Sequence, residues 1–379
     1  MENIKICKRC IYDGNVPGIS FDEEGICNYC RNIEKMEQEY PNDERGEKIL
    51  KGIITRIKHD GRNKKYDCMI GVSGGCDSSF MVYKMKELGL RPLAVHFDNT
   101  WNSTIATENI KKVLKKLDVD LYTLVVDNKE YDDIYRSFLK SGVKDIEAPT
   151  DIAYAATLRI AAEKFKIKYI LEGHNFRTEG ISPLGMLYMD GKYIESVQKK
   201  HGTMKLRTYP NMKLGRFIKW LIFSNIKMIR PLYYVEYDKD EVMKFLEKDF
   251  DWKWYGGHHL ENRFTAFYHS YFMPRRFGID SRINGFSALI RSGQLDREKG
   301  LKLLKEPPYL EDEIISLIKK RLGFSDDEFE RLMTMPHKTF RDFRTYKKTF
   351  EIMRPFFWLM YKLDRIPKSF YDKYTRKLK

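Results

Sequence analysis

The sequence predicts an α/β fold built on a doubly wound parallel sheet, with a cysteine-rich module before it and a mainly helical region after it. Short apolar segments alternate with segments of helical apolar spacing between residue 66 and about residue 235. Four of the six cysteines fall within the first 30 residues, and strand signals fade beyond residue 235. Strands separated by helical segments pair in parallel through right-handed crossovers, which gives this fold class.

The expected elements follow in order along the chain. A polar connector after residue 32 predicts a helix interrupted near Pro41. Buried strands are expected at 67–72, 91–97, 120–126 and 168–173. Helices are expected at 78–88, 104–117, 130–140 and 150–165. Thr150 or Asp151 is the expected N-cap of the last of these. The expected parts are a module over 1–32, a connector over 33–65, the α/β domain over 66–235 and a helical region over 236–379.

Composition narrows the class of protein. With 379 residues, 42% hydrophobic and 32% charged, the chain is globular, not disordered. No apolar run approaches the roughly 18 residues of a membrane span, and the N-terminus has no signal-peptide core, so a cytoplasmic protein is expected. The net charge of +15 indicates an anionic partner. The excess is concentrated from His337 to Lys379, where 13 Lys and Arg accompany 4 Asp and Glu.

The early cysteines form two pairs, each with two intervening residues: Cys7 with Cys10 and Cys27 with Cys30. This spacing allows four thiolates to close a tetrahedral site, and four protein ligands leave no open position. We therefore expect a structural Zn²⁺, with an iron site or a bare thiol cluster as the alternatives. A module this short gains stability directly from the metal.

The stretch SGGCDSS (73–79) lies between a predicted strand and a predicted helix. Its two glycines allow the backbone to approach an anion, its serines can donate hydrogen bonds, and the helix N-terminus adds partial positive charge. It lacks the Gly-Lys-Ser/Thr of the Walker loop. Asp77 is unusual beside an anion, and Mg²⁺ bridging to the phosphates would explain it.

SGGCDS resembles the SGGxDS loop of the PP-loop ATP pyrophosphatases, which include GMP synthetase and tRNA-thiolating enzymes. The resemblance implies a Rossmann-like sheet with ATP across its carboxyl ends. It also implies Asp77, His174 and Arg230 as catalytic residues, although a hydrogen-bonded loop histidine is the alternative for His174. The implied nucleotide-binding residues are Ser73, Gly74, Gly75, Asp77, Ser78, Ser79, Val95, Phe97, Asp98 and Gly173.

Three longer stretches are similar to the bacterial N-acetyl sugar amidotransferases: the cysteine module, HFDNTWN (96–102) and the block over 255–282. The similarity runs from about residue 5 to 335. It implies an enzyme of surface-polysaccharide or nonulosonic-acid synthesis that converts the acetamido group of an activated or free sugar to an acetamidino group. ATP would adenylylate the amide oxygen, and ammonia would then displace AMP. No cysteine lies in the sequence context of a glutaminase nucleophile. A separate glutaminase and ammonia-channel protein is therefore expected.

The block over 255–282 also supplies candidate substrate residues. Guanidinium groups suit phosphates and carboxylates, and the candidates are His258, His259, Arg275, Arg276 and Arg282. Surface arginines without a ligand are the alternative.

Two competing functions remain. A tRNA-thiolating enzyme fits the charge, but only Cys68 and Cys76 lie outside the module, which leaves little for persulfide chemistry. A non-catalytic nucleotide sensor is disfavoured by the intact loop. The basic, aromatic segments 211–230 and 356–379 are expected to pack on the protein. Peripheral contact with the inner face of a membrane is the alternative for them, and nucleic acid is a less favoured partner.

Overall fold

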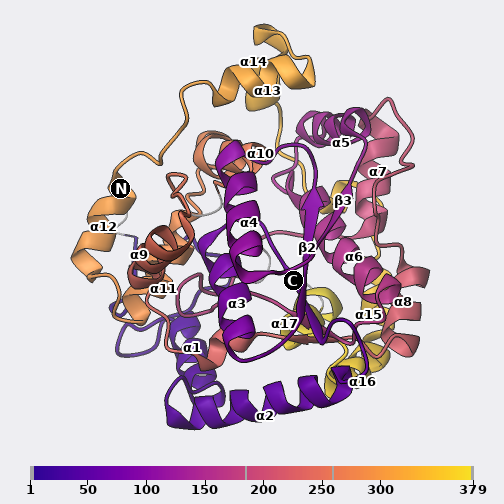
Figure 1. Cartoon of the computed structure of the whole chain (residues 1–379). Helices are drawn as coiled ribbons and strands as arrows, with labels where there is room; N and C mark the ends of the chain where they lie inside the picture. Colours follow the sequence, from indigo (N-terminus) through magenta and orange to yellow (C-terminus); the bar gives the residue numbers. More distant parts are fainter. Residues whose placement is uncertain (1–3, 184–185, 258–259, 377–379) are drawn as a thin grey trace.

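The computed structural model describes residues 4–183, 186–257 and 260–376. Its centre is a parallel sheet with strand order β3-β2-β1-β4-β5; Figure 1 labels two of these strands, β2 and β3, among the surrounding helices. The strands are β1 (Cys68–Gly71), β2 (Pro92–Asp98), β3 (Leu121–Val125), β4 (Tyr169–Leu171) and β5 (Lys227–Ile229). The four expected strands and the doubly wound class are confirmed. Strand β5 was not expected, because its three residues show only a weak strand pattern in the sequence.

Helices cover both faces of the sheet (Figure 1). Apolar side chains of β1 pack on one helical layer in a cluster that contains Ile57, Met81, Val113 and Leu246. That layer comprises α2 (Glu44–Gly61), α3 (Cys76–Glu87), α4 (Thr104–Leu117) and α9 (Lys239–Phe250). The other side carries α5 (Asn128–Ser141), α6 (Ala148–Lys164), α7 (Gly191–His201) and α8 (Leu214–Phe223). The layers bring the start of α3 and the start of α6 to the carboxyl edge of the strands, since both helices lie in parallel crossovers.

The connector is helical as expected. It contains α1 (Asn28–Glu39) and α2, which are separated by the turn at Pro41. Asp43 caps α2 by accepting hydrogen bonds from the amides of Arg45 and Gly46.

The expected N-cap of α6 was wrong. The helix begins at Ala148 after Glu147, with Pro149 in its first turn. A proline in that position loses no intrahelical hydrogen bond and favours the helical φ, so the helix begins before Thr150. The Thr150 hydroxyl instead shares a 2.8 Å hydrogen bond with the hydroxyl of Tyr135.

The C-terminal region is helical, as expected, and it surrounds the sheet domain rather than standing apart from it (Figure 1). Aromatic side chains from its helices join a core cluster with α5 and α7. The short η1 (Pro231–Tyr234) precedes this region. Besides α9, its elements are α10 (Arg263–Phe267), the π-helix η2 (Tyr268–Phe277), α11 (Arg282–Arg291), α12 (Arg297–Lys305), α13 (Ile314–Leu322), α14 (Asp326–Thr334), η3 (Phe340–Asp342), α15 (Lys347–Ile352), α16 (Arg354–Lys362) and α17 (Lys368–Thr375).

The basic, aromatic segments pack on the protein. Phe217 of α8 stacks on Phe357 of α16, and Phe370 of α17 contacts both. Within the described ranges, no helix combines the length and the hydropathy that a bilayer span requires.

Candidate functional site

The glycine loop connects the end of β1 to the start of α3, at the carboxyl edge of the sheet. Gly74 has a φ of +83°, and a Cβ added there would lie 2.2 Å from the carbonyl oxygen of Ala106. Both the left-handed backbone and this contact with α4 require glycine. The loop therefore presents the N-terminus of a twelve-residue helix at close backbone range, which is the arrangement that binds phosphate.

Side chains of the loop itself, and side chains from distant segments, hold the loop in place. Ser73 Oγ accepts a hydrogen bond from the Gly75 amide at 3.3 Å, and Ser78 Oγ donates to the Gly75 carbonyl at 3.2 Å. The Gly74 carbonyl accepts from Trp252 Nε1 at 3.0 Å and from Asn109 Nδ2 at 3.3 Å. These bonds preorganise the predicted phosphate loop. Ser79 is buried in the first turn of α3.

Asp77 lies at the start of α3 among groups from distant segments. Its Oδ1 accepts a 2.6 Å hydrogen bond from the Tyr237 hydroxyl, and its Oδ2 lies 3.6 Å from Lys239 Nζ. Burial alone would lower the pKa of Lys239, but Asp77 and Glu179 raise it. The lysine therefore stays charged beside the loop. Sequence reasoning missed Lys239 because it is one of many lysines on helical segments.

Glu261 is a second carboxylate at the loop. Its Oε1 lies 3.6 Å from a Cβ built at Gly75, and its Oε2 is buried without a hydrogen-bond partner. An oxygen left unpaired in this way suits a cation, and one or two carboxylates with phosphate oxygens and water are the usual ligands of Mg²⁺. Asp77 and Glu261 therefore fit a Mg²⁺ bound together with a nucleotide. Sequence reasoning missed Glu261 although it lies within the block over 255–282.

The residues expected beside adenine lie along β2. Val95 and Phe97 are two residues apart, so their buried side chains lie on the same face of the strand, in two neighbouring apolar clusters that both include residues of α6. Asp98 Oδ1 accepts from the Thr100 amide at 2.7 Å and from Asn102 Nδ2 at 3.3 Å. Of these three residues, Asp98 is the one with a polar side chain, and it lies at the carboxyl end of β2. The adenine contact of the three stays a prediction.

Gly173 and His174 follow β4. The Cβ of a residue at Gly173 would come within 3.4 Å of Ser78, so glycine allows β4 and α3 to meet. The His174 ring bonds through Nδ1 to the Tyr233 hydroxyl and through Nε2 to the Gly180 carbonyl, both at 3.0 Å. Burial and the charge of Arg230 lower the pKa of His174 to about 4. A neutral ring donates to the carbonyl and accepts from the tyrosine.

Arg230 completes this network. Its Nε bonds Glu172 at 2.9 Å and its Nη1 donates to the Tyr233 hydroxyl at 3.3 Å. The structure thus unites the predicted residues His174 and Arg230 through Tyr233. Because both nitrogens of His174 are engaged, the geometry makes it a positioning residue. Its catalytic role stays a prediction.

The expected substrate residues lie apart from one another. Arg276 is buried and donates to the carbonyls of Leu332 and Met335, at the end of α14. Arg282 pairs with Asp280 and donates to the Glu306 carbonyl. Arg275 is exposed, and His258 and His259 lie outside the described residues. Arg276 and Arg282 serve the C-terminal fold in this structure, and substrate contact by any of the five stays a prediction.

The four N-terminal cysteines come together in the fold. Their Sγ atoms all lie within 4.8 Å of one another and the residues are buried; Cys7 and Cys30 are 3.9 Å apart, as are Cys10 and Cys27. Zn–S bonds of about 2.3 Å in a tetrahedron place the sulfurs about 3.8 Å apart. The donor set therefore fits a structural Zn²⁺, and it would hold the metal without an open position.

The cysteine module is attached to the C-terminal region. Arg297 donates to the carbonyls of Cys7 and Cys10 at 2.9 and 3.2 Å. The amide of Ile11 donates to Ser287 Oγ. A metal in the module would therefore stabilise α11 and α12 as well as the first 30 residues.

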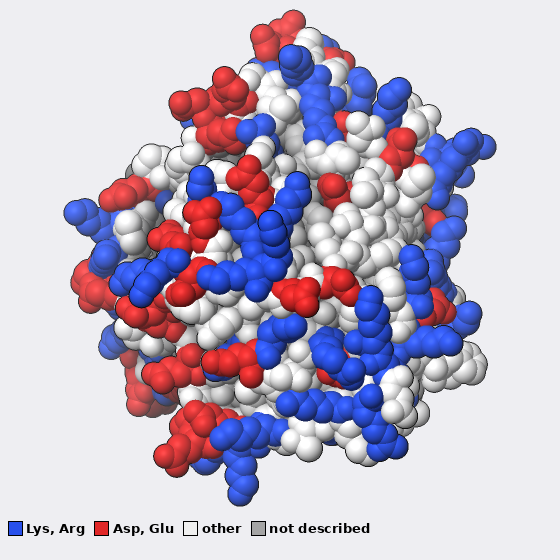
Figure 2. Space-filling view, viewed as in Figure 1, with Lys and Arg blue, Asp and Glu red and all other residues white. Residues whose placement is uncertain are grey.

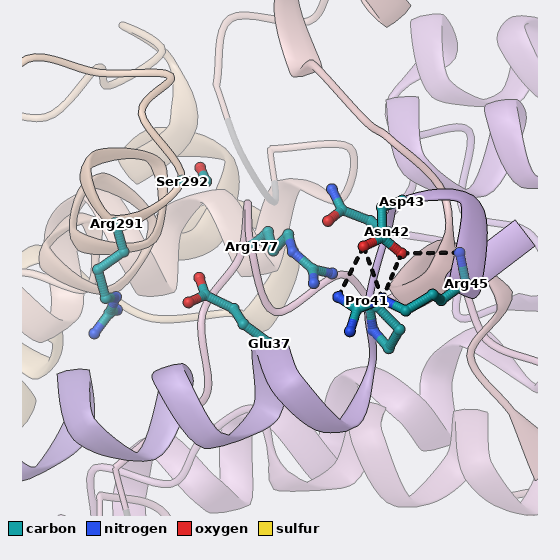
Figure 3. Close-up of a pocket in the computed structure, with 8 residues that line it drawn as sticks. All are labelled: Glu37, Pro41, Asn42, Asp43, Arg45, Arg177, Arg291 and Ser292. Carbon is teal, nitrogen blue, oxygen red and sulfur yellow. Dashed lines mark hydrogen bonds and ion pairs between the residues drawn. The ribbon is translucent and has the colours of Figure 1, made fainter.

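A separate pocket of about 300 Å³ opens between the α1–α2 turn and α11. Figure 3 shows Arg177 in the middle of it, between Glu37 and the turn that carries Asp43. Arg177 donates to the carbonyls of Tyr233 and Tyr40. None of the predicted site residues lines this pocket, and its arginine holds the connector against η1.

Residues 261–356 match the family model for the C-terminal domain of LPS biosynthesis protein WbpG-like proteins. The chain carries a WbpG-like C-terminal domain. This WbpG-like domain begins at Glu261, the residue whose carboxylate lies beside Gly75. The match confirms, for this part of the chain, the resemblance drawn from the residues over 255–282.

Relatives match more of the chain. An uncharacterized protein of Methanocaldococcus jannaschii is 28% identical over 310 residues, which cover 79% of this chain and 93% of that protein. The tRNA-specific 2-thiouridylase MnmA of Proteus mirabilis is 28% identical over 49% of this chain and 50% of its own length. The glutamine-hydrolyzing GMP synthase of Thermus thermophilus is 27% identical over 61% and 41%. The chain thus spans half or less of the length of these two enzymes.

Solved structures with similarity include the NH3-dependent NAD synthetase of Campylobacter jejuni, with a TM-score of 0.34 and 11% identity over 77% of this chain and 98% of that one. The U34-tRNA thiolase NcsA of Methanococcus maripaludis has a TM-score of 0.32 and 14% identity over 71% and 92%.

Proposed function

We propose that the protein is an ATP-dependent, AMP-forming amidotransferase that converts the acetamido group of an N-acetyl sugar to an acetamidino group. The observation that carries the proposal is the junction of Gly75 with Glu261: an SGGxDS loop is completed by the first residue of a domain similar to LPS biosynthesis proteins. A nucleotide site built from both parts supports an ATP reaction in polysaccharide synthesis.

The proposed reaction has two steps. The acetamido oxygen attacks the α-phosphorus of ATP, pyrophosphate leaves, and the amide proton is lost, which gives an O-adenylyl imidate. Ammonia then forms a C–N bond at the imidate carbon, the C–O bond breaks, and the oxygen leaves with AMP. Adenylylation is needed because an amide oxygen is otherwise a poor leaving group.

The loop residues have defined roles in the first step. Ser73, Gly74, Gly75 and Ser78 would hold the departing pyrophosphate, with the N-terminus of α3 opposing its charge. Mg²⁺, held by Asp77 and Glu261, would supply charge neutralisation at the phosphates. Lys239 adds a fixed positive charge within 3.6 Å of Asp77.

The second step needs a nitrogen source. The cysteines in the module are buried in the four-sulfur cluster, and Cys68 and Cys76 are buried in the sheet domain. A thiol of this kind does not serve as a glutaminase nucleophile. A separate glutaminase with an ammonia channel is therefore part of the proposal.

A tRNA-thiolating enzyme is the second candidate, because the thiouridylase of Proteus mirabilis is similar to 49% of this chain. Burial raises the pKa of Cys76 to about 12, and its sulfur lies 3.5 Å from the Tyr237 hydroxyl in the core. Persulfide transfer needs an accessible thiolate. Neither cysteine of the sheet domain meets that need, which favours the amidotransferase.

Membrane contact is a further part of the proposal. Basic side chains gather in Figure 2 at the lower right, over the region where Figure 1 places α8 and α16. Exposed apolar residues occur on the same helices, including Phe223 (76% exposed) and Trp358 (49% exposed). This combination suits the anionic inner face of a membrane, and the enzyme would be cytoplasmic with a peripheral contact.

The test is AMP and pyrophosphate release from ATP with ammonium chloride, run in parallel with N-acetylated nucleotide sugars, free N-acetyl sugars and bulk tRNA. The proposal predicts sugar-dependent AMP and a product lighter by the exchange of O for NH. AMP that appears only with tRNA would support the thiolation alternative instead.

A further inference from the structure

An acidic pocket lies at the start of α6, outside the loop site described above. It is lined by Asp145, Glu147 and Asp151, by Tyr268 of η2 and by the segment 187–189. Asp145 and Glu147 are 3% and 7% exposed, whereas Asp151 is open to solvent. The pocket offers about 10 Å³ to the centre of a water-sized molecule. That is room for about one such molecule.

Two buried polar atoms in the pocket wall have no hydrogen-bond partner in the described part of the chain: Glu147 Oε1 and the Tyr268 hydroxyl. The other oxygen of Glu147 accepts from Thr265 Oγ1 at 3.2 Å, so the side chain is held while Oε1 stays unpaired. Buried polar groups are almost always paired. Two orphaned atoms in one small pocket indicate a missing small polar ligand.

The charges around the pocket favour a cation. Three carboxylates face it: Asp145, Glu147 and Asp151. The opposing charges are Lys144, which interacts with Asp145, and Lys373, which interacts with both Asp145 and Asp151. Burial and the charge of Asp151 raise the pKa of Glu147 to about 8, with Thr150 and Thr265 acting in the opposite direction. Burial raises the pKa of Asp145 to about 6. A bound cation would relieve this crowding of two buried carboxylates and the neighbouring carboxylate of Asp151.

The pocket is joined to the phosphate loop by two short connections. On α6, Tyr154 follows Asp151 by one helical turn, and its hydroxyl lies 2.0 Å from a Cβ built at Gly71, the last residue of β1. In the WbpG-like domain, Glu261 lies beside Gly75 while Thr265 bonds Glu147. The same two segments therefore line the nucleotide loop and the pocket.

We propose that this pocket receives an ammonium ion and that Glu147 takes a proton from it, so that ammonia is released next to the activated substrate. The inference rests on the proposed function and deepens it. One N–H bond of ammonium breaks and its proton bonds to Glu147 Oε1. The freed lone pair of ammonia then forms the C–N bond as the imidate oxygen leaves with AMP.

The first test measures whether the pocket binds a monovalent cation, independently of the catalysed reaction. Thallium(I) has the charge and nearly the size of ammonium, and its anomalous scattering locates it in crystals of the full chain. We expect a peak between Glu147 Oε1 and the Tyr268 hydroxyl that ammonium acetate displaces. A pocket without thallium at saturating concentration overturns the inference, whatever reaction the enzyme catalyses.

The second test separates the two steps. With ammonium chloride as nitrogen source, Glu147→Gln should raise the KM for ammonium by about tenfold or more, the effect of losing one charged hydrogen bond. Its sugar-dependent exchange of pyrophosphate into ATP should be unchanged. Tyr268→Phe, which removes only the orphaned hydroxyl, should raise the same KM by a smaller factor. Glu108→Gln on the exposed side of α4 is the control.

The outcomes are distinguishable. Equal losses of exchange and amination in Glu147→Gln, or an unchanged KM for ammonium in both variants, contradict the pocket's role. Absence of sugar-dependent exchange in the unmodified enzyme contradicts the proposed function instead, and the thallium experiment then decides the pocket by itself.

Discussion

The hydroxyl of Tyr237 donates a 2.6 Å hydrogen bond to Oδ1 of Asp77, across 160 residues of sequence. The bond fixes the carboxylate at the start of α3, and Lys239, two residues beyond the tyrosine, faces the other oxygen. The segment before α9 thus completes the loop that β1 begins. Asp77 is held in place before any nucleotide binds, which is the preorganisation that phosphoryl chemistry requires.

Asp77→Ala should abolish AMP formation with little effect on folding or on zinc content. The side chain lies beside the loop, 16% exposed, and is one of two carboxylates that fit Mg²⁺. Asp77→Asn, of equal size, should lose activity to the same extent if charge is the reason. Turnover within twofold of the original in either variant would show that the site is assigned wrongly.

Gly74→Ala should lower both stability and activity. The new Cβ would meet the Ala106 carbonyl at 2.2 Å, and the φ of +83° disfavours any side chain. We expect a loss of about 1–3 kcal/mol in the free energy of unfolding, measured by urea denaturation. Gly52→Ala is the matched control, since it lies inside α2 with no atom within 4 Å. It should gain roughly 0.5–1 kcal/mol. Equal responses of the two variants would contradict this account of the loop.

Cys7→Ser should lower the zinc content from one ion per chain and loosen the attachment of α12. Arg297 holds the carbonyls of Cys7 and Cys10, so loss of the metal reaches the C-terminal region. Metal analysis together with hydrogen exchange of α11 and α12 checks both effects. Cys68→Ala, outside the module, should keep the zinc. Full zinc content in Cys7→Ser would refute the four-sulfur site.

His174 should make unfolding depend on pH between about 6.5 and 4. Its pKa is lowered to about 4 by burial and by Arg230, so in that range the unfolded chain binds a proton that the folded chain does not. The contribution of His174 to the free energy of unfolding is complete above about pH 6.5 and decreases as the pH falls toward 4. The difference in unfolding free energy between the unmodified protein and His174→Asn should therefore shrink toward acid pH. A difference that is constant with pH would contradict the neutral, doubly bonded ring.

Phe223→Ser with Trp358→Ser should weaken binding to vesicles of anionic lipid while leaving sugar-dependent AMP formation intact. Both side chains are exposed and lie on helices far from the loop in sequence. Vesicle sedimentation at low and at physiological salt measures the effect. Leu121→Ser, exposed on the edge strand β3, is the control. Equal sedimentation of all variants would leave the two helices without a membrane role.

The local parts of the structure were predictable from the sequence. The cysteine spacing predicts a cluster because both pairs are tight turns, and the glycine loop is placed by the strand before it and the helix after it. The contributions of Tyr237, Lys239 and Glu261 could not be predicted in this way. Each lies at least 160 positions beyond Asp77, and nothing in its local pattern distinguishes it from other polar residues.

Arg276 shows a contact that the sequence did not predict, while its contact with substrate stays a prediction. From the sequence, a guanidinium in the block over 255–282 predicts an anionic ligand. In the structure, the guanidinium of Arg276 donates to two carbonyls at the end of α14. A helix C-terminus carries partial negative charge and unpaired carbonyls. The hydrogen bonds of Arg276 therefore depend on which helix end lies beside it, and the arginine alone does not predict this.

The central claim is that ATP activates the acetamido oxygen, and transfer of that oxygen tests it most directly. The substrate is an N-acetyl sugar with oxygen-18 in the acetamido carbonyl, supplied with ATP and ammonium chloride. The account predicts AMP that carries one oxygen-18 on phosphorus, in an amount equal to the amidine formed. Unlabelled AMP, or AMP formed equally well without the sugar, would contradict it.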